Sequence, residues 1–331
     1  IRRQRQLCIR DSADGSIGWN TCTRFLGIEY ESRIGDEIGQ AIIQMDSYAL
    51  HAITAFEEKY GSLRPSTRLP DVSPPATERS TDGHEFRSPI AVLLWLARCL
   101  RADIYRCVGD FTTVVEYWRP EHLPELKKLM AVVKSTMDLK MSLRIRFRDF
   151  ATSRARLTAW SDAAMREPKS VGGFVIAIAG PGGDDSLAVL HYSTKTIPLQ
   201  TTSSTAAEFC GAGNVPEPLA LINQVLKELQ VLTEDSPTPL VLLDSQPVLQ
   251  GIIRGFAPYD PLYTSLTKTA RMRICQLSQL AQSNTLEFDF CKSADNRADG
   301  MTKIFDSEKM RSMWRQLNMA TNFDKRPTDR P

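Results

Sequence analysis

The sequence lacks several features that would assign it to a simple class of protein. No apolar run reaches the roughly 20 residues that a membrane-spanning helix needs, and no secretory signal is present. The 41 basic and 39 acidic side chains nearly cancel, which leaves a formal net charge of +2. Bulk charge therefore does not require a nucleic-acid partner, and any such partner has to be bound by local patches.

Cysteine and histidine are too scattered to build a metal site of their own. The seven cysteines are odd in number and contain no C-x-x-C pair. This usage argues against a zinc site or a disulfide framework and favours an intracellular, reducing compartment. The four histidines, His51, His84, His122 and His191, match no ligand spacing. The chain begins at Ile1 instead of Met, which we interpret as the mark of a processed product or a fragment.

The 331 residues fit about two domains, and the first half divides into three parts. Residues 1–61 contain a predicted strand at 23–30, a hairpin partner at 38–45 and a helix from Asp46 to about Tyr60. Residues 62–85 are rich in Pro, Ser, Thr and Asp and are predicted to be a linker. Residues 86–150 are predicted to be helical, with helices that begin at Ser88-Pro89, near Asp103 and near Glu121.

The pattern changes to strands in the second half, residues 151–305. Three apolar runs begin at Leu157, Val171 and Leu187 and predict an antiparallel meander. A helix that carries Glu208 follows, then a helix from Leu219, a strand before Asp244, a helix after Pro247, a helix from Leu262, a strand near Thr285, and a closing helix over 296–303. With successive helices counted as one, the expected order is β-β-β-α-β-α-β-α.

The C-terminal part, residues 306–331, is predicted to be a helix over 307–317 followed by a tail. Trp314 in that helix is interpreted as a docking residue for a partner. The tail beyond about Asn318 is rich in charge and proline and is expected to be disordered or partner-dependent.

Five arginines between Arg144 and Arg156, with Phe147 and Phe150 among them, form a basic run just before the first of the three strands. Such a run can follow a nucleic-acid backbone, or it can be a solvated connector. Its position favours nucleic acid. We therefore assign nucleic-acid contacts to Arg146, Arg148 and Arg154.

Four carboxylates carry the chemistry of the second half. Asp162, Glu208, Asp244 and Asp299 each follow an apolar run or lie in an early turn of a predicted helix. Acids placed in this way can converge at one edge of a sheet. Clustered Asp and Glu supply the hard oxygen ligands that Mg²⁺ prefers, and two such ions about 4 Å apart activate water and neutralise a developing alkoxide.

Each acid also has a structural interpretation. Asp162 could end a strand, Glu208 could be a solvated helix residue, Asp244 could cap the helix near Pro247, and Asp299 could complement a helix dipole. Taken singly, these interpretations are favoured. The four acids taken together, in this order, favour the metal site, since inward-facing like charges repel strongly without a cation.

The second half resembles the ribonuclease H domain of copia-type LTR retrotransposons. Ser161-Asp162-Ala163 resembles the family's S-D-A motif, and Ser203 to Phe209 resembles S-S-T-x-A-E-Y. Asp244-Ser245-Gln246 resembles D-N-Q in its retroviral D-S-Q form, and Ala298 to Lys303 resembles A-D-x-x-T-K. The resemblance implies that Asp162, Glu208, Asp244 and Asp299 are the catalytic acids and hold two Mg²⁺ ions, or Mn²⁺. We assign nucleic-acid contacts to Ser245, Gln246 and Asn296 beside them.

The first half resembles the reverse transcriptase of the same elements. Phe25 to Glu29 is similar to the F-L-G-I-E strand that follows the polymerase active site, and the segment from Phe86 to Ile104 is similar to the thumb and connection. The resemblance implies an α/β fold: a ribonuclease H-like mixed five-stranded sheet with flanking helices, preceded by a mostly helical thumb/connection-like domain with a short hairpin. Residues 1–61 then correspond to the palm edge and thumb.

The departures from the family bear on activity. The polymerase motif Tyr-x-Asp-Asp is absent from this sequence, so DNA synthesis by this chain alone is not expected. Ala164 and Met165 replace the family's Asp and Trp, and Pro216 and Pro218 break a helix that is usually continuous. We therefore expect a Mg²⁺-dependent ribonuclease H that acts on RNA–DNA hybrids. The alternative is a domesticated, weakly active or inactive module that binds structured RNA or serves as a subunit of a larger complex.

Overall fold

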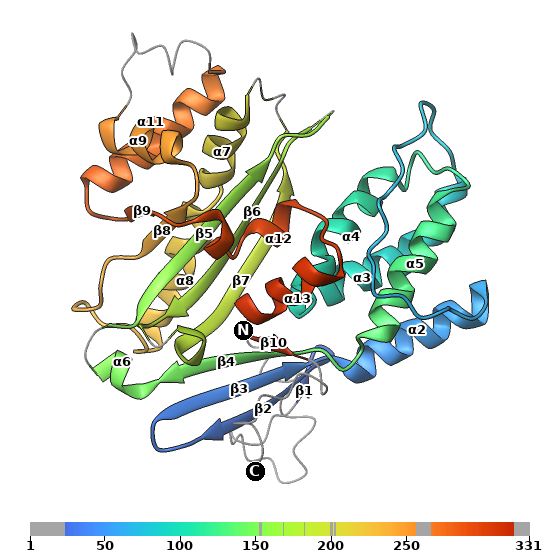
Figure 1. Cartoon of the computed structure of the whole chain (residues 1–331), viewed down its shortest axis with the longest axis horizontal. Coiled ribbons are helices and arrows are strands. Elements are labelled where there is room, and N and C mark those ends of the chain that lie inside the picture. The colour runs from blue at the N-terminus through green and yellow to red at the C-terminus, as the bar shows by residue number, and fades with distance from the viewer. Residues whose placement is uncertain are drawn as a thin grey trace.

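The computed structural model describes residues 24–151, 154–167, 169–181, 183–198, 201, 203–255 and 266–320, and Figure 1 shows how their elements are arranged. The basic N-terminal segment and the predicted tail from residue 321 lie outside the described residues. No helix in the described part of the chain is long and apolar enough to cross a membrane. The cysteines within it, at 99, 107, 210, 275 and 291, are all free thiols.

The second half forms a mixed five-stranded sheet in the order β7-β6-β5-β8-β9. Strands β5, β6 and β7 form the predicted antiparallel meander, whereas β8 pairs parallel with β5, and β9 pairs parallel with β8. The mixed five-stranded sheet that the sequence predicted is thereby confirmed. The five strands are β5 (Arg156–Ala164), β6 (Val171–Ala179), β7 (Leu187–Thr196), β8 (Leu240–Leu243) and β9 (Glu287–Phe290).

Helices cover one face of this sheet, and the sequence of β6 shows why both faces are buried. Phe174, Ile176 and Ile178 point to the face covered by these helices, while Val175 and Ala177 point to the other, because successive side chains alternate along a strand. The helical layer consists of α7 (Ser204–Ala212), α8 (Pro216–Glu228), α9 (Gln246–Arg254) and α11 (Lys268–Gln282). In Figure 1, α7, α9 and α11 lie above and to the left of the sheet, and α8 lies lower down.

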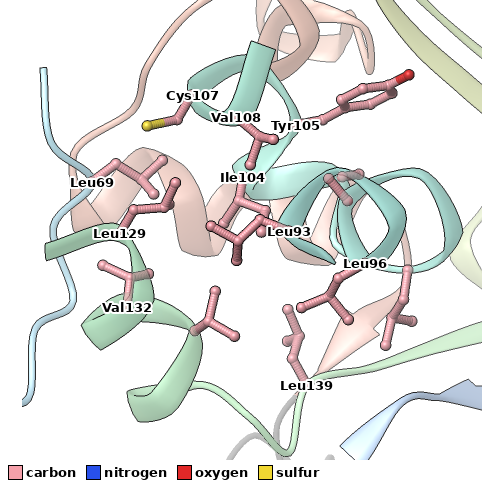
Figure 2. Packing of buried hydrophobic residues seen from close by; sticks show 14 of the residues in the cluster. Leu69, Leu93, Leu96, Ile104, Tyr105, Cys107, Val108, Leu129, Val132 and Leu139 are labelled. Carbon is pink, nitrogen blue, oxygen red and sulfur yellow. The ribbon is translucent and has the colours of Figure 1, made fainter. Parts of the chain in front are cut away.

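The helices of the first half cover the other face. They surround a core built from Leu93, Leu96, Ile104, Leu129 and their neighbours, which Figure 2 shows from close by. Residues 62–81, most of the predicted linker, contain no helix or strand. The helical elements are α2 (Asp46–Tyr60), η1 (Asp82–Phe86), α3 (Arg87–Cys99), α4 (Ala102–Val114) and α5 (His122–Ser135).

A second five-stranded sheet, in the order β1-β2-β3-β4-β10, corrects the expectation of a short hairpin followed only by helices. The basic run, for which the sequence offered a nucleic-acid contact or a solvated connector, begins in β4, which pairs with β3 over six residues. In β4, Met141, Leu143 and Ile145 alternate with polar residues, which is a strand period. The elements are β1 (Arg24–Phe25), β2 (Ile28–Ile34), β3 (Ile38–Gln44), β4 (Lys140–Arg146), the short α6 (Phe147–Ala151) and β10 (Met319–Ala320).

Several predicted element ends were wrong. The strand expected over 23–30 breaks at Leu26 and Gly27, which have φ angles of 52° and 83°. Ser88-Pro89 does not open its helix, because α3 begins at Arg87. The closing helix expected over 296–303 is reduced to η3 (Ser293–Asp295) and α12 (Asp299–Thr302).

Trp314, interpreted from the sequence as a docking residue for a partner, is buried within the chain. It lies in α13 (Ser307–Gln316), and only 6 % of its surface is exposed. It belongs to the same core as Ile104 of α4 and Trp160 of β5, so the two halves of the chain share one apolar core. Tyr192 of β7 adds a polar contact between them, since its hydroxyl donates to the Ala97 carbonyl over 2.7 Å.

A buried ion pair between Arg101 and Asp103 holds the start of α4 in place. The Arg101 guanidinium donates to both carboxylate oxygens of Asp103, over 2.9 and 2.8 Å, and to the hydroxyl of Thr136 over 2.8 Å. Arg101 and Asp103 are 2 % and 4 % exposed. The pair links the start of α4 to the end of α5. Its two hydrogen bonds to the carboxylate offset the cost of burying the Arg101 guanidinium.

We expect Asp103→Ala to lower the free energy of unfolding by about 3–5 kcal/mol, since it leaves the Arg101 guanidinium buried without a counter-charge. Urea unfolding followed by tryptophan fluorescence measures this change. As a control, Glu234→Ala removes an ion pair with Lys227 at a side chain that is 88 % exposed and should cost less than about 1 kcal/mol. Equal effects of the two substitutions would contradict a structural role for the buried pair.

Candidate metal centre

The parallel pairing of β5 and β8 brings the first two acids together. Ser161 of β5 lies opposite Leu243 of β8, so the next residue on each strand, Asp162 and Asp244, emerges at the same end of two neighbouring strands. Adjacent strands lie about 4.8 Å apart. The pairing of β5 with β8 thus makes Asp162 and Asp244 neighbours although they are more than 80 positions apart in sequence.

Helix α7 delivers the third acid, Glu208. Ser203 caps this helix by accepting a hydrogen bond from the Ala206 N–H over 3.1 Å. The helix lies unusually close to the sheet at Gly211, where a Cβ atom would be 3.0 Å from the Ala163 side chain and 3.2 Å from the Asp162 carbonyl oxygen. A larger residue at Gly211 would push α7 away, and with it the carboxylate of Glu208.

The three carboxylates form a compact group. One oxygen from each of Asp162, Glu208 and Asp244 lies within 4.8 Å of the others. Burial, opposed by the Thr302 hydrogen bond and the Lys303 charge, raises the pKa of Asp162 to about 6. Burial, together with the charges of Asp162 and Asp244, raises the pKa of Glu208 to about 9. Burial is the largest cause of both shifts and the neighbouring acids add to it, so a proton or a cation would relieve the crowding of these carboxyls.

Helix α12 holds Asp162 from the other side. The Asn296 amide donates to the Ser161 carbonyl over 3.0 Å and accepts from the Ala298 N–H, which fixes the segment before α12 against β5. Gly173 of β6 allows α12 to approach, since a Cβ there would lie 2.3 Å from that of Met301. The Thr302 hydroxyl then donates to the Asp162 carboxylate.

The fourth acid, Asp299, lies beside the group but not within it. Its carboxylate is paired with the ammonium of Lys303, four residues along the chain, and that ammonium is also 3.8 Å from Asp162. Burial lowers the pKa of Lys303, but the hydrogen bond to Asp299 and the surrounding acids outweigh burial and raise it overall. Lys303 therefore carries a positive charge between Asp162 and Asp299.

Thr302 and Lys303 belong to the segment that resembles A-D-x-x-T-K, yet the sequence interpretation gave them no role. The four-residue spacing of Asp299 and Lys303 is a signal that could have been used, because residues at i and i+4 meet on a helix. The contact of Thr302 with Asp162 has no such signal, since 140 residues separate them.

The predicted nucleic-acid residues beside the acids differ in their exposure. Gln246 is exposed and Ser245 is half-buried at the start of α9, and both remain predicted contacts. Asn296 is 1 % exposed, and its amide is engaged by Ser161 and Ala298. Its position corrects the prediction: Asn296 positions α12 and does not present its amide to a ligand.

The predicted arginine contacts lie near the other sheet. The Arg146 guanidinium is half-buried and lies 3.4 Å from the Asp185 carboxylate, which also pairs with Arg144 over 3.2 Å. This shared acid offsets part of the positive charge of the basic run. Arg148 and Arg154 are exposed, so their contacts with nucleic acid stay predictions.

The donor set fits a hard divalent cation. All three ligand residues of the group are carboxylates, and Mg²⁺ and Mn²⁺ prefer carboxylate oxygens to sulfur or imidazole. No described cysteine or histidine joins the group. Asp162, Glu208 and Asp244 are therefore the residues that would hold such an ion.

No protein-family model and no curated relative matches the chain. Several solved structures are similar to it. Ribonuclease H1 from Halobacterium salinarum is 17 % identical, with 44 % of this chain and 93 % of that chain covered and a TM-score of 0.29. LC11-RNase H1 in complex with an RNA/DNA hybrid is 17 % identical, with 47 % and 99 % covered and a TM-score of 0.29. The protease–reverse transcriptase of prototype foamy virus is 16 % identical, with 50 % and 20 % covered and a TM-score of 0.26. At these values the function has to be argued from the site itself.

The raised pKa values predict how pH acts on the metal-free protein. The folded-state pKa values of Asp162 and Glu208, about 6 and 9, exceed the ordinary values of 3.8 and 4.5. The contribution of these two carboxyls to the free energy of unfolding is therefore fully present below about pH 4 and is lost as pH rises through 6 and 9. Glu208→Gln should therefore unfold at a higher temperature than the parent in EDTA, by a margin that grows up to about pH 9. Calorimetric melting between pH 5 and 9 measures it.

The matched control is Glu234→Gln, at an exposed side chain, whose margin should stay near zero at every pH. A pH-independent margin for Glu208→Gln would show that this carboxylate is not crowded by its neighbours.

Proposed function

We propose that the chain is a ribonuclease H-like nuclease that hydrolyses the RNA strand of RNA–DNA hybrids with Mg²⁺ or Mn²⁺ and has no polymerase activity of its own. The observation that carries the proposal is the approach of the Asp162, Glu208 and Asp244 oxygens to within 4.8 Å of one another. Three converging carboxylates without a cation would be costly. The motifs around these acids support descent from a copia-type retroelement.

The protein's own groups supply binding and orientation. Asp162 is held in place by the Thr302 hydroxyl, and the segment before α12 is held by the Asn296 amide. A divalent ion bound here lowers the pKa of a bound water and offsets the charge that develops on the leaving oxygen. Ser245 and Gln246 lie at the start of α9, next to Asp244, where they can contact the strand being cut.

Lys303 bears on the number of ions. The sequence interpretation assigned two ions to the four acids, but the Lys303 ammonium lies between the carboxylates of Asp162 and Asp299. A single ion at the three-acid group, with Lys303 as the second positive charge, satisfies all four acids.

Cleavage of an end-labelled RNA–DNA hybrid tests the proposed activity. The wild-type protein should cut the RNA strand in the presence of Mg²⁺ or Mn²⁺, and not after EDTA treatment. Asp162→Asn and Asp244→Asn should each lower the rate about 1,000-fold, since metal-based stabilisation contributes several kcal/mol and 1.4 kcal/mol is tenfold.

The matched control is Asp235→Asn. Asp235 is exposed and precedes β8, whereas Asp244 follows it, so the two residues lie at opposite ends of one strand. Asp235→Asn should leave the rate unchanged. If the wild-type protein cuts no hybrid with either metal, the nuclease proposal is wrong and a structural or RNA-binding role is left.

Calorimetric titration with Mn²⁺ tests the role of Lys303. The wild-type protein should bind one ion at the three-acid group. Lys303→Met should bind a second ion, because removing the ammonium leaves Asp162 and Asp299 as unpaired carboxylates. Lys309→Met, at an exposed lysine of α13, is the control and should bind one. Two ions in the wild-type protein would contradict this assignment and support the four-acid site.

A further inference from the structure

A cleft lies where helices of the first half meet the edge of the ribonuclease H-like sheet. It has a volume of about 230 Å³, which is several times the roughly 30 Å³ that one water molecule occupies in the liquid. Helices α3 and α4 provide one wall, and strands β6 and β7 provide the other. The lining residues are Leu94, Arg98, Tyr105, Arg106, Gly109, Thr112, Val171, Thr194 and Thr196.

Arg106 makes this cleft more than a gap between elements. The residue is 5 % exposed, and one terminal nitrogen of its guanidinium pairs with the Asp110 carboxylate over 2.6 Å. Its Nε–H is buried and has no hydrogen-bond partner among the described residues. A buried donor without an acceptor is costly, and an anionic oxygen in the cleft would satisfy it.

The remaining lining is also suited to an anion. Arg98 is exposed and is oriented by a hydrogen bond from its Nε to the Tyr105 hydroxyl over 3.3 Å. Thr196 is an exposed hydroxyl at the end of β7. No acidic side chain lines the cleft in the described part of the chain. Asp110, the nearest acid, is already paired with both Arg106 and Arg166.

The position of the cleft relative to the acids indicates which anion it would bind. Thr194 lies opposite Gly173, and Gly173 lies opposite Asp162, on three consecutive strands. Two strand spacings place the cleft about 10 Å from Asp162. Because each nucleic-acid strand carries one phosphate per about 3.4 Å of helix axis, a strand cut at the acids would bring a phosphate a few nucleotides away to the cleft.

Contacts within the fold connect the cleft to the site. The Thr194 hydroxyl donates to the Met301 carbonyl, and the next residue, Thr302, donates to Asp162. Figure 1 shows α12 between the sheet and α4, and α12 contacts both. The same short helix therefore contacts both a residue of the cleft and one of the acids.

We infer that this cleft is a phosphate-binding subsite for the bound nucleic acid, in which Arg106 and Arg98 contact a single backbone phosphate away from the scissile bond. The inference rests on the proposed function for its choice of ligand. Helix α4 supplies Arg106 from the first half of the chain, and the sheet supplies Thr196 from the second. The subsite thus exists only when the two halves pack together.

Fluorescence anisotropy with a labelled RNA–DNA hybrid tests this subsite, in EDTA so that binding is measured without cleavage. Arg98→Ala and Arg106→Lys should each weaken binding about tenfold, because a hydrogen bond to a charged group is lost. The slope of log K against log salt should become shallower by up to about 0.9 for Arg98→Ala, which removes a positive charge, and stay the same for Arg106→Lys, which keeps one. Lysine at 106 keeps the charge beside Asp110 but lacks the Nε–H donor, and melting curves confirm that each variant is folded.

Lys227→Ala is the matched control, since it removes one positive charge from α8 on the opposite face of the sheet. It should change neither affinity nor slope. A single neutral methylphosphonate, placed in turn at each position of either strand, locates the contact. One position should weaken binding to the wild-type protein about tenfold and weaken binding to Arg98→Ala by clearly less, because only the Arg106 contact is left there.

The outcomes separate the possible errors. If Arg98→Ala and Arg106→Lys bind the hybrid as the wild-type protein does, the inference is wrong. Inorganic phosphate added to the melting curves tests a second case. If the variants bind the hybrid normally and lose only the rise in melting temperature that inorganic phosphate gives the wild-type protein, the cleft binds a free anion and the inference is also wrong. Because cleavage plays no part in these measurements, a protein that binds through the cleft but never cuts would overturn the proposed function alone.

Discussion

The repulsion among three carboxylates is the constraint on which the rest of the site depends. The parallel register of β5 and β8 places Asp162 next to Asp244, and the close approach of α7 at Gly211 adds Glu208. Burial and mutual repulsion raise the pKa of both Asp162 and Glu208. A fold that holds three carboxylates this close together forms a binding site for a cation. Beside α12, the Thr302 hydroxyl donates to Asp162, and the Lys303 ammonium offsets part of the negative charge.

The first half of the chain supports this site. Its helices share an apolar core with the sheet, and α4 contacts both β7 and α12. The buried pair of Arg101 and Asp103 fixes the start of α4. The position of α12, and therefore of the groups around Asp162, depends on helices that lie more than 100 residues earlier in the sequence.

The sequence predicted most of the second half because its strands are apolar on both faces and its acids follow them directly. The strands that begin at 156, 171 and 187 and the helix with Glu208 were found where expected. The second sheet was missed, since the arginines at 144 and 146 in β4 were interpreted as part of a basic run, and β10 has only two residues. Local patterns carry little information about a strand whose stability comes from distant partners.

Residue types and their order along the chain determined that four acids would be available and that three strands would form a meander, and the family resemblance added the mixed sheet with flanking helices. Only the tertiary structure decided which acids meet. It grouped Asp162, Glu208 and Asp244, paired Asp299 with Lys303, buried Asn296, and placed Arg106 in a cleft facing β7. The physical reason is that these outcomes depend on distances of a few ångströms between segments far apart in sequence, and such distances follow from packing and strand register.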